Sequence, residues 1–139
     1  MRYVLDTDVV VAGLRSPTGA SAALMRAALE GRVALLASVP LFLEYEAVCV
    51  LREHRLAAGL NLSELRQFLD GLAAIVEPVR IHYLWRPQLR DPADEMVMET
   101  AVNGHADGLV TFNRRDFGDA PARFGLKLLL PSEAIRKLR

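Results

Sequence analysis

Short apolar runs alternate with longer helix-forming segments along the chain, and this order constrains the fold more than any other feature. The apolar runs cover residues 3–5, 33–37, 79–82, 107–111 and 127–130. Their β-branched, aromatic and aliphatic side chains favour buried strands. Alternating strands and helices favour a parallel sheet with right-handed crossovers and helices on both faces. The sequence predicts a single α/β domain over residues 1–139, a three-layer α/β/α sandwich around a central parallel sheet of about five strands.

The segments between the strands carry helix start and stop signals. Ser21 precedes an alanine-rich segment that ends at Gly31, and Asp91-Pro92 combines an N-cap with proline at the first helical position. Turn-forming residues at 15–19 predict a loop after the first strand. The expected helices cover residues 22–29, 40–55, 63–77, 92–103 and a terminal segment from 131 or 132. Further loops are expected at 84–92 and 113–117.

The composition is that of a globular protein without a strong electrostatic preference. Apolar residues make up 52% of the chain and charged residues 24%, which argues against disorder. The formal net charge is zero, so nucleic acid binding requires a local basic patch. Cys49 is the single cysteine, which leaves no internal disulfide and no thiolate metal site. No apolar run approaches a membrane span and the chain opens on a strand, so we expect a cytoplasmic protein.

Four acidic residues fall on one edge of the predicted sheet. Asp6 ends the first strand, and Asp116 lies just past the fourth. Glu44 and Asp94 lie in the first turns of the helices that follow the second strand and precede the fourth. Helix N-termini and strand C-termini share the ligand-binding edge of a parallel α/β sheet. The sequence therefore predicts that these acids converge.

Converging carboxylates repel each other unless a cation lies between them. Oxygen ligands without cysteine or a histidine cluster favour a hard ion, Mg²⁺ or Mn²⁺. Two such ions about 3.5–4 Å apart clamp a phosphodiester and activate a water molecule. Helix N-termini at the same edge offer backbone N–H groups to phosphate.

Each of these acids also has a purely structural interpretation. Asp6 is a common residue at the end of a strand, and Glu44 suits an exposed helix surface. Asp94 fits the third position of a capping box, Asp91 is a helix cap rather than a ligand, and Asp116 fits a plain loop.

Neighbouring polar residues are open to the same two interpretations. Thr111 either donates a hydrogen bond to a metal-binding acid or simply ends its strand. Arg114 and Arg115 either contact RNA phosphates or belong to a solvated loop.

In order and spacing, four motifs together resemble the PIN domain family across nearly the whole chain. They are Asp6-Thr-x-Val, Glu44, Asp91-Pro-x-Asp94 and Val110-Thr-x-Asn-x-x-Asp116-Phe. The likeness is greatest to the toxins of bacterial toxin–antitoxin pairs. It implies a metal-dependent single-strand ribonuclease of α/β/α fold that forms homodimers, and a cognate antitoxin that blocks its site.

The resemblance also implies roles for individual residues. Asp6, Glu44 and Asp94 match catalytic and metal-binding positions. Asn113 occupies a position where many relatives carry an acid, so either Asn113 or Asp116 completes the site, and Asp116 is favoured because it carries charge. Asp8 stands where an Asn is common and adds a further carboxylate.

Two other functions remain open at this point. A non-catalytic PIN-like module would dock a partner without cleaving RNA. The Asp6-x-Asp8 pair also resembles the first motif of the haloacid-dehalogenase superfamily, whose phosphatases use an aspartyl-phosphate. That chemistry needs a lysine between its acidic motifs, and the first lysine of this chain is Lys127.

Overall fold

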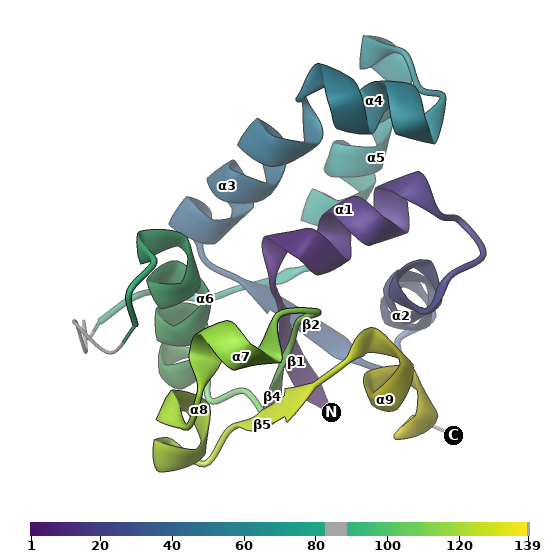
Figure 1. Ribbon diagram of the computed structural model, residues 1–139. Coiled ribbons are helices and arrows are strands. Elements are labelled where there is room, and N and C mark those ends of the chain that lie inside the picture. The colour runs from purple at the N-terminus through teal and green to yellow at the C-terminus, as the bar shows by residue number, and fades with distance from the viewer. Residues whose placement is uncertain (83–88, 139) are drawn as a thin grey trace.

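The computed structural model describes residues 1–82 and 89–138 and confirms the predicted α/β/α architecture (Figure 1). Within those residues the chain forms a sheet of five parallel strands in the order β3-β2-β1-β4-β5. The strands are β1 (Arg2–Leu5), β2 (Ala34–Ala37), β3 (Glu77–Pro78), β4 (Gly108–Val110) and β5 (Lys127–Leu129).

Helices connect every pair of successive strands, and α9 (Pro131–Arg136) follows β5. The connecting helices are α1 (Thr7–Arg15), α2 (Ala20–Leu29), α3 (Val39–Cys49), α4 (Arg52–Ala58), α5 (Leu62–Ile75), α6 (Pro92–Asn103), α7 (Arg114–Phe117) and α8 (Ala120–Arg123). The chain moves outward from β1 to β3 and then returns to β4 and β5. Right-handed crossovers therefore place α1 to α5 on one face and α6 to α8 on the other.

The central strand β1 fixes where the functional edge lies. Tyr3 pairs with Leu35 on one side and with Gly108 on the other, and the apolar residues of β1 are buried. The strand order reverses between β1 and β4. Ligands of open α/β sheets bind at such a reversal, outside the carboxyl ends of the strands.

Helix α1 was not predicted from the sequence. The chain enters α1 directly after Asp6, where a loop was expected. The β-branched run at Val9–Val11 has weak intrinsic helix propensity. Burial outweighs that preference, because Val9 and Val10 are fully buried in the core.

The single helix expected over residues 40–55 is wrong, because two helices form there. Leu41, Tyr45 and Cys49 face the core at a spacing of four residues, whereas none of the residues Arg52–Ala58 is buried. The buried stripe thus ends at Cys49. The chain turns at Leu51, and α4 continues in a new direction.

The third strand was predicted too late in the sequence, at residues 79–82. Pairing occurs at Glu77–Pro78, and Val79 adds one hydrogen bond from its N–H to the carbonyl of Ala37. Pro78 is tolerated because β3 is an edge strand. His82 donates its N–H to the side chain of Asn103 instead of to a strand.

The remaining differences concern short elements. The loop expected at 113–117 contains α7, and α8 follows it. The loop expected at 84–92 falls largely on residues 83–88, outside the described residues. Among the described helices, none has the length and apolar character needed to cross a membrane.

Candidate functional site

Asp6 lies at the reversal point between β1 and β4, and both of its carboxylate oxygens are held. Oδ1 accepts the N–H of Thr7 at 2.8 Å, so Asp6 caps α1. Oδ2 accepts the hydroxyl of Thr111 at 2.7 Å from the end of β4. The residue is only 8% exposed. The structure therefore confirms that Thr111 binds an acid of the predicted site.

The charges around Asp6 come from acids far apart in the sequence. Burial raises the pKa of Asp6, and the negative charges of Asp116 and Asp91 raise it further. The hydrogen bonds from Thr111 and Thr7 lower this pKa and so offset part of the increase.

Asp94 responds to the same group of charges. Burial, followed by the charges of Asp6, Asp91 and Asp116, raises its pKa from 3.8 to about 6. The N-cap of α1 and acids of α6 and α7 are thus close enough for their charges to disfavour the ionisation of Asp6 and Asp94. Carboxylates perturbed in this way by neighbouring charges are characteristic of functional sites.

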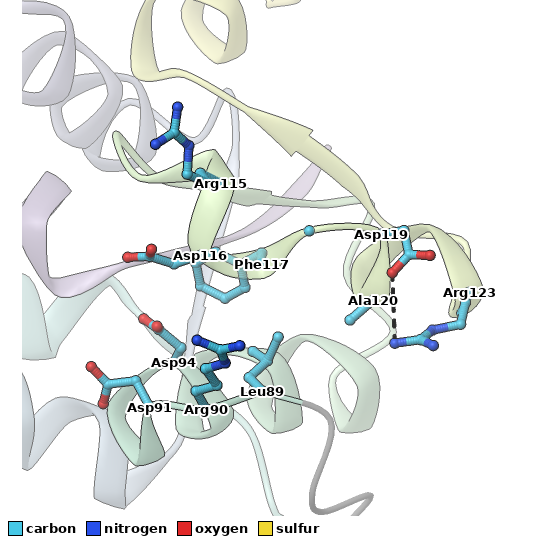
Figure 2. Close-up of a pocket in the computed structure, with 11 residues that line it drawn as sticks. Leu89, Arg90, Asp91, Asp94, Arg115, Asp116, Phe117, Asp119, Ala120 and Arg123 are labelled. Carbon is cyan, nitrogen blue, oxygen red and sulfur yellow. Dashed lines mark ion pairs between the residues drawn. The ribbon is translucent and has the colours of Figure 1, made fainter.

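A pocket of about 510 Å³ lies beside these acids (Figure 2). Asp91 and Asp94 line it from α6, and Asp116 lines it from α7 on the opposite wall. Asp119 and Arg123 form an ion pair of 3.9 Å at the far end. The pocket therefore has an acidic side toward Asp6 and a mixed side farther away.

The structural interpretation of Asp91 is confirmed, although the residue also lines the pocket. Its side chain accepts the N–H of Ala93 at 2.9 Å and caps α6. Asp116, which was expected in a loop, lies within α7. That short helix is anchored by Phe117, which is almost fully buried.

Glu44 is the predicted site residue with the weakest connection to the others. It is half-buried on α3 and does not line the acidic pocket. Its neighbour Tyr45 donates its hydroxyl to the carbonyl of Leu5 at 2.5 Å, so this part of α3 is docked against the end of β1. The membership of Glu44 in the site stays a prediction.

Asp8 and Asn113 pair with each other beside the acidic cluster. Oδ2 of Asp8 accepts the amide of the Asn113 side chain and the backbone N–H of Phe112, both at 3.1 Å. The backbone N–H of Asn113 also donates to the Thr111 hydroxyl at 3.0 Å. This network fixes the loop after β4. Asn113 donates hydrogen bonds within this network, while Asp116 lines the acidic pocket.

Arg114 and Arg115, which the sequence analysis treated together, have different surroundings in the structure. Arg114 forms a 2.9 Å ion pair with Glu133 and ties α7 to α9, whereas Arg115 lines the pocket. Arg90 and Arg123 also line it, and sequence reasoning missed both. The position of Arg90 directly before the cap Asp91 was an available signal. Arg123 enters only through the packing of α8.

The chemistry of these donors suits a hard divalent cation, because carboxylate oxygens are its preferred ligands. Across residues 1–82 and 89–138, no group of three or more Asp, Glu, His or Cys side chains is arranged to hold a metal ion. The acids thus have the ligand type that a divalent cation prefers, and a cation would relieve the repulsion between them. They do not form a complete set of ligands among the described residues.

The sheet order and the acids at its reversal point define an α/β/α protein with an acidic site at the carboxyl edge of a parallel sheet. The sequence model of the PIN domain matches residues 2–115, most of the 139-residue chain, so the protein belongs to the PIN domain family. PIN domains are generally nucleases, and these nucleases typically use divalent metals. No curated protein and no solved structure matched the chain.

Proposed function

We propose that this protein is a metal-dependent endoribonuclease that hydrolyses RNA phosphodiester bonds. The observation that carries the proposal is the convergence of acids at the reversal point of the sheet: the charges of Asp6 and Asp116 raise the pKa of Asp94, and the charge of Asp116 also raises the pKa of Asp6. Acids that oppose each other's ionisation favour a bound cation, because a cation removes the repulsion.

Asp6, Asp94 and Asp116 would hold Mg²⁺ or Mn²⁺, with Glu44 as the fourth catalytic ligand. A bound divalent ion stabilises charge on the phosphate and lowers the pKa of the attacking water. Asp6 keeps a fixed orientation because Thr7 and Thr111 hold one oxygen each. A carboxylate has about four acceptor positions, so these bonds leave room for a metal.

The arginines support RNA as the substrate. Arg90 and Arg123 line the same pocket as the acids, whereas the guanidinium group of Arg115 points away from those acids (Figure 2). Guanidinium groups bind phosphate oxygens with two parallel hydrogen bonds. A strand of RNA passing the acidic side would therefore meet a cationic lining for its neighbouring phosphates.

The biological role that we propose is that of a toxin acting on cytoplasmic RNA. Its partners would be a second copy of the chain and a cognate antitoxin protein. Large apolar side chains exposed on α3, Val39 at 71% and Leu43 at 57%, support a protein-binding surface there. Sedimentation of the purified chain tests the homodimer. A small gene directly upstream that encodes a DNA-binding antitoxin would support the toxin role.

Asp6→Asn tests the nuclease proposal directly. The side-chain oxygen of asparagine can still accept the N–H of Thr7, and its amide group can donate to the hydroxyl of Thr111. The substitution removes the negative charge that binds the cation, so we expect a folded protein that does not cleave RNA. Asp70→Asn is the matched control, because it removes one carboxylate from the exposed surface of α5. Cleavage of single-stranded RNA is measured with Mg²⁺ and with Mn²⁺. Equal cleavage by Asp6→Asn and the control would refute the proposal that Asp6 is catalytic, and no cleavage by the wild-type chain with either metal would favour a non-catalytic module.

A further inference from the structure

A second pocket opens at the same carboxyl edge of the sheet. Its volume is about 280 Å³, and its walls come from the second half of α1, the start of α2, the loop after β4 and the start of α9. It shares no lining residue with the acidic pocket. The residue that connects the two regions is Phe112.

Phe112 is an exposed aromatic side chain in a fixed backbone position. It is 49% exposed and lines the second pocket. Its N–H donates to Asp8, and the preceding residue, Thr111, holds Asp6. An exposed aromatic ring thus lies next in sequence to Thr111, the residue that holds Asp6 of the acidic site.

Ser21 supplies an unsatisfied polar group to this pocket. The residue is only 3% exposed, and its hydroxyl has no hydrogen-bond partner among the described residues. It lies in the first turn of α2, whose cap residue Gly19 provides no side-chain hydrogen bond. Buried hydroxyl groups are normally paired. A polar edge of a ligand would satisfy this one.

The lining of this pocket selects the kind of ligand. Its walls are mainly alanine, leucine, proline and serine, and among the described residues no charged side chain lines it. The acidic pocket, by contrast, contains both carboxylates and arginines. The second pocket therefore suits a flat, neutral group with an apolar face and a hydrogen-bonding edge rather than a phosphate.

We propose that this pocket binds one unpaired nucleobase of the RNA substrate, stacked on Phe112 and hydrogen-bonded to Ser21. Unpaired bases stack on aromatic side chains and hydrogen-bond through their edges. The identification of RNA rests on the proposed function. A base held here must leave its helix, so the pocket selects single-stranded RNA beside the phosphodiester at the acidic site.

Binding is tested without cleavage by titrating the isotope-labelled chain with adenosine, guanosine, cytidine and uridine in turn. We expect saturable NMR shifts at the backbone amides of residues 20–22 and 112 with at least one nucleoside. Phe112→Ala should abolish these shifts and Phe112→Tyr should retain them, while ribose alone should produce none. The absence of shifts at these amides with all four nucleosides would overturn the proposal.

Cleavage kinetics provide the second test. Phe112→Ala should raise KM for single-stranded RNA by roughly 5- to 100-fold, more than it lowers kcat, because stacking is lost. Phe112→Leu keeps the apolar bulk without the aromatic face and should show the same defect. Ser21→Ala should weaken nucleoside binding without lowering Tm, which separates binding from a structural role.

The outcomes distinguish this inference from the proposed function. Nucleoside binding at Phe112 without cleavage by the wild-type chain would refute the nuclease and keep the pocket. Normal cleavage with an unchanged KM in Phe112→Ala would overturn the pocket and keep the nuclease.

Discussion

Replacing Asp8 with asparagine should stabilise the folded protein at neutral pH. Asp8 is half-buried beside Asp6, and burial followed by the charge of Asp6 raises its pKa from 3.8 to about 6. An asparagine oxygen can still accept the N–H groups of Phe112 and Asn113, whereas the repulsion toward Asp6 disappears. The variant therefore removes a charge and keeps the contacts that hold the loop after β4.

The pKa of Asp8 sets the size and the sign of this effect. Because folding raises the pKa of Asp8, the folded state binds this proton more tightly than the unfolded state, so the contribution of Asp8 to stability is greatest below pH 3.8 and is lost as the pH rises through about 6. A tenfold change in proton affinity corresponds to about 1.4 kcal/mol, which gives an upper limit of about 3 kcal/mol. Water screens the exposed part of the side chain, so we expect a gain of about 1–2 kcal/mol for Asp8→Asn at pH 7.5.

Urea denaturation of both proteins at pH 4.0 and pH 7.5, without divalent metal, measures the difference. The gain in the free energy of unfolding should be present at pH 7.5 and nearly absent at pH 4.0. Asp119→Asn is the control, since the side chain of Asp119 is 90% exposed and surface substitutions change stability by about 0.5 kcal/mol or less. A gain of equal size at both pH values, or a loss at pH 7.5, would refute the electrostatic reasoning.

Three further predictions concern the residues that hold Asp6 and the end of β1. The hydroxyl of Thr111 donates to Asp6 and accepts the N–H of Asn113, and Thr111→Val removes both hydrogen bonds. This substitution should lower the free energy of unfolding, measured in urea, by about 2–3 kcal/mol. Mg²⁺ or Mn²⁺ at 100 times its dissociation constant should stabilise the protein by about 2.7 kcal/mol in a thermal-shift assay. Asp6→Asn should lose this stabilisation. Tyr45→Phe leaves the buried carbonyl of Leu5 unpaired and should cost about 1–2 kcal/mol by calorimetry; an unchanged Tm would contradict this.

Four of the five strands were predictable because their apolar runs are short and are separated by clear turn and cap signals, whereas the third was predicted two residues too late. Their parallel order followed from the intervening helices, and that order placed Asp6 at the functional edge. Helix α1 was not predictable in the same way, because Val9 and Val10 favour a strand when considered locally. Only the burial of these valines against other elements selects the helix, and one chain's sequence does not show that contact.

Site residues were predictable where their position at the end of a strand or the start of a helix was enough to place them at the carboxyl edge of the sheet. Asp6 and Asp94 lie at the end of a strand and in the first turn of a helix, and the structure brings their charges together. The lining by Arg90 and Arg123 depends on how α6 and α8 pack, which local patterns do not report. Glu44 has the same difficulty, since its direction from α3 depends on the docking of Tyr45.

Helix α1, which was not predicted from the sequence, also favours the ionised form of Asp6 that the proposed metal site requires. A carboxylate buried among other acids gains a raised pKa, and protonation would remove its affinity for a cation. Because α1 begins at Thr7, its first N–H binds one oxygen of Asp6, and Thr111 binds the other from β4. Both bonds favour the ionised form and are in place before any ligand arrives. The strand, the helix and the neighbouring strand thus counter together the electrostatic penalty that the acidic site imposes on Asp6.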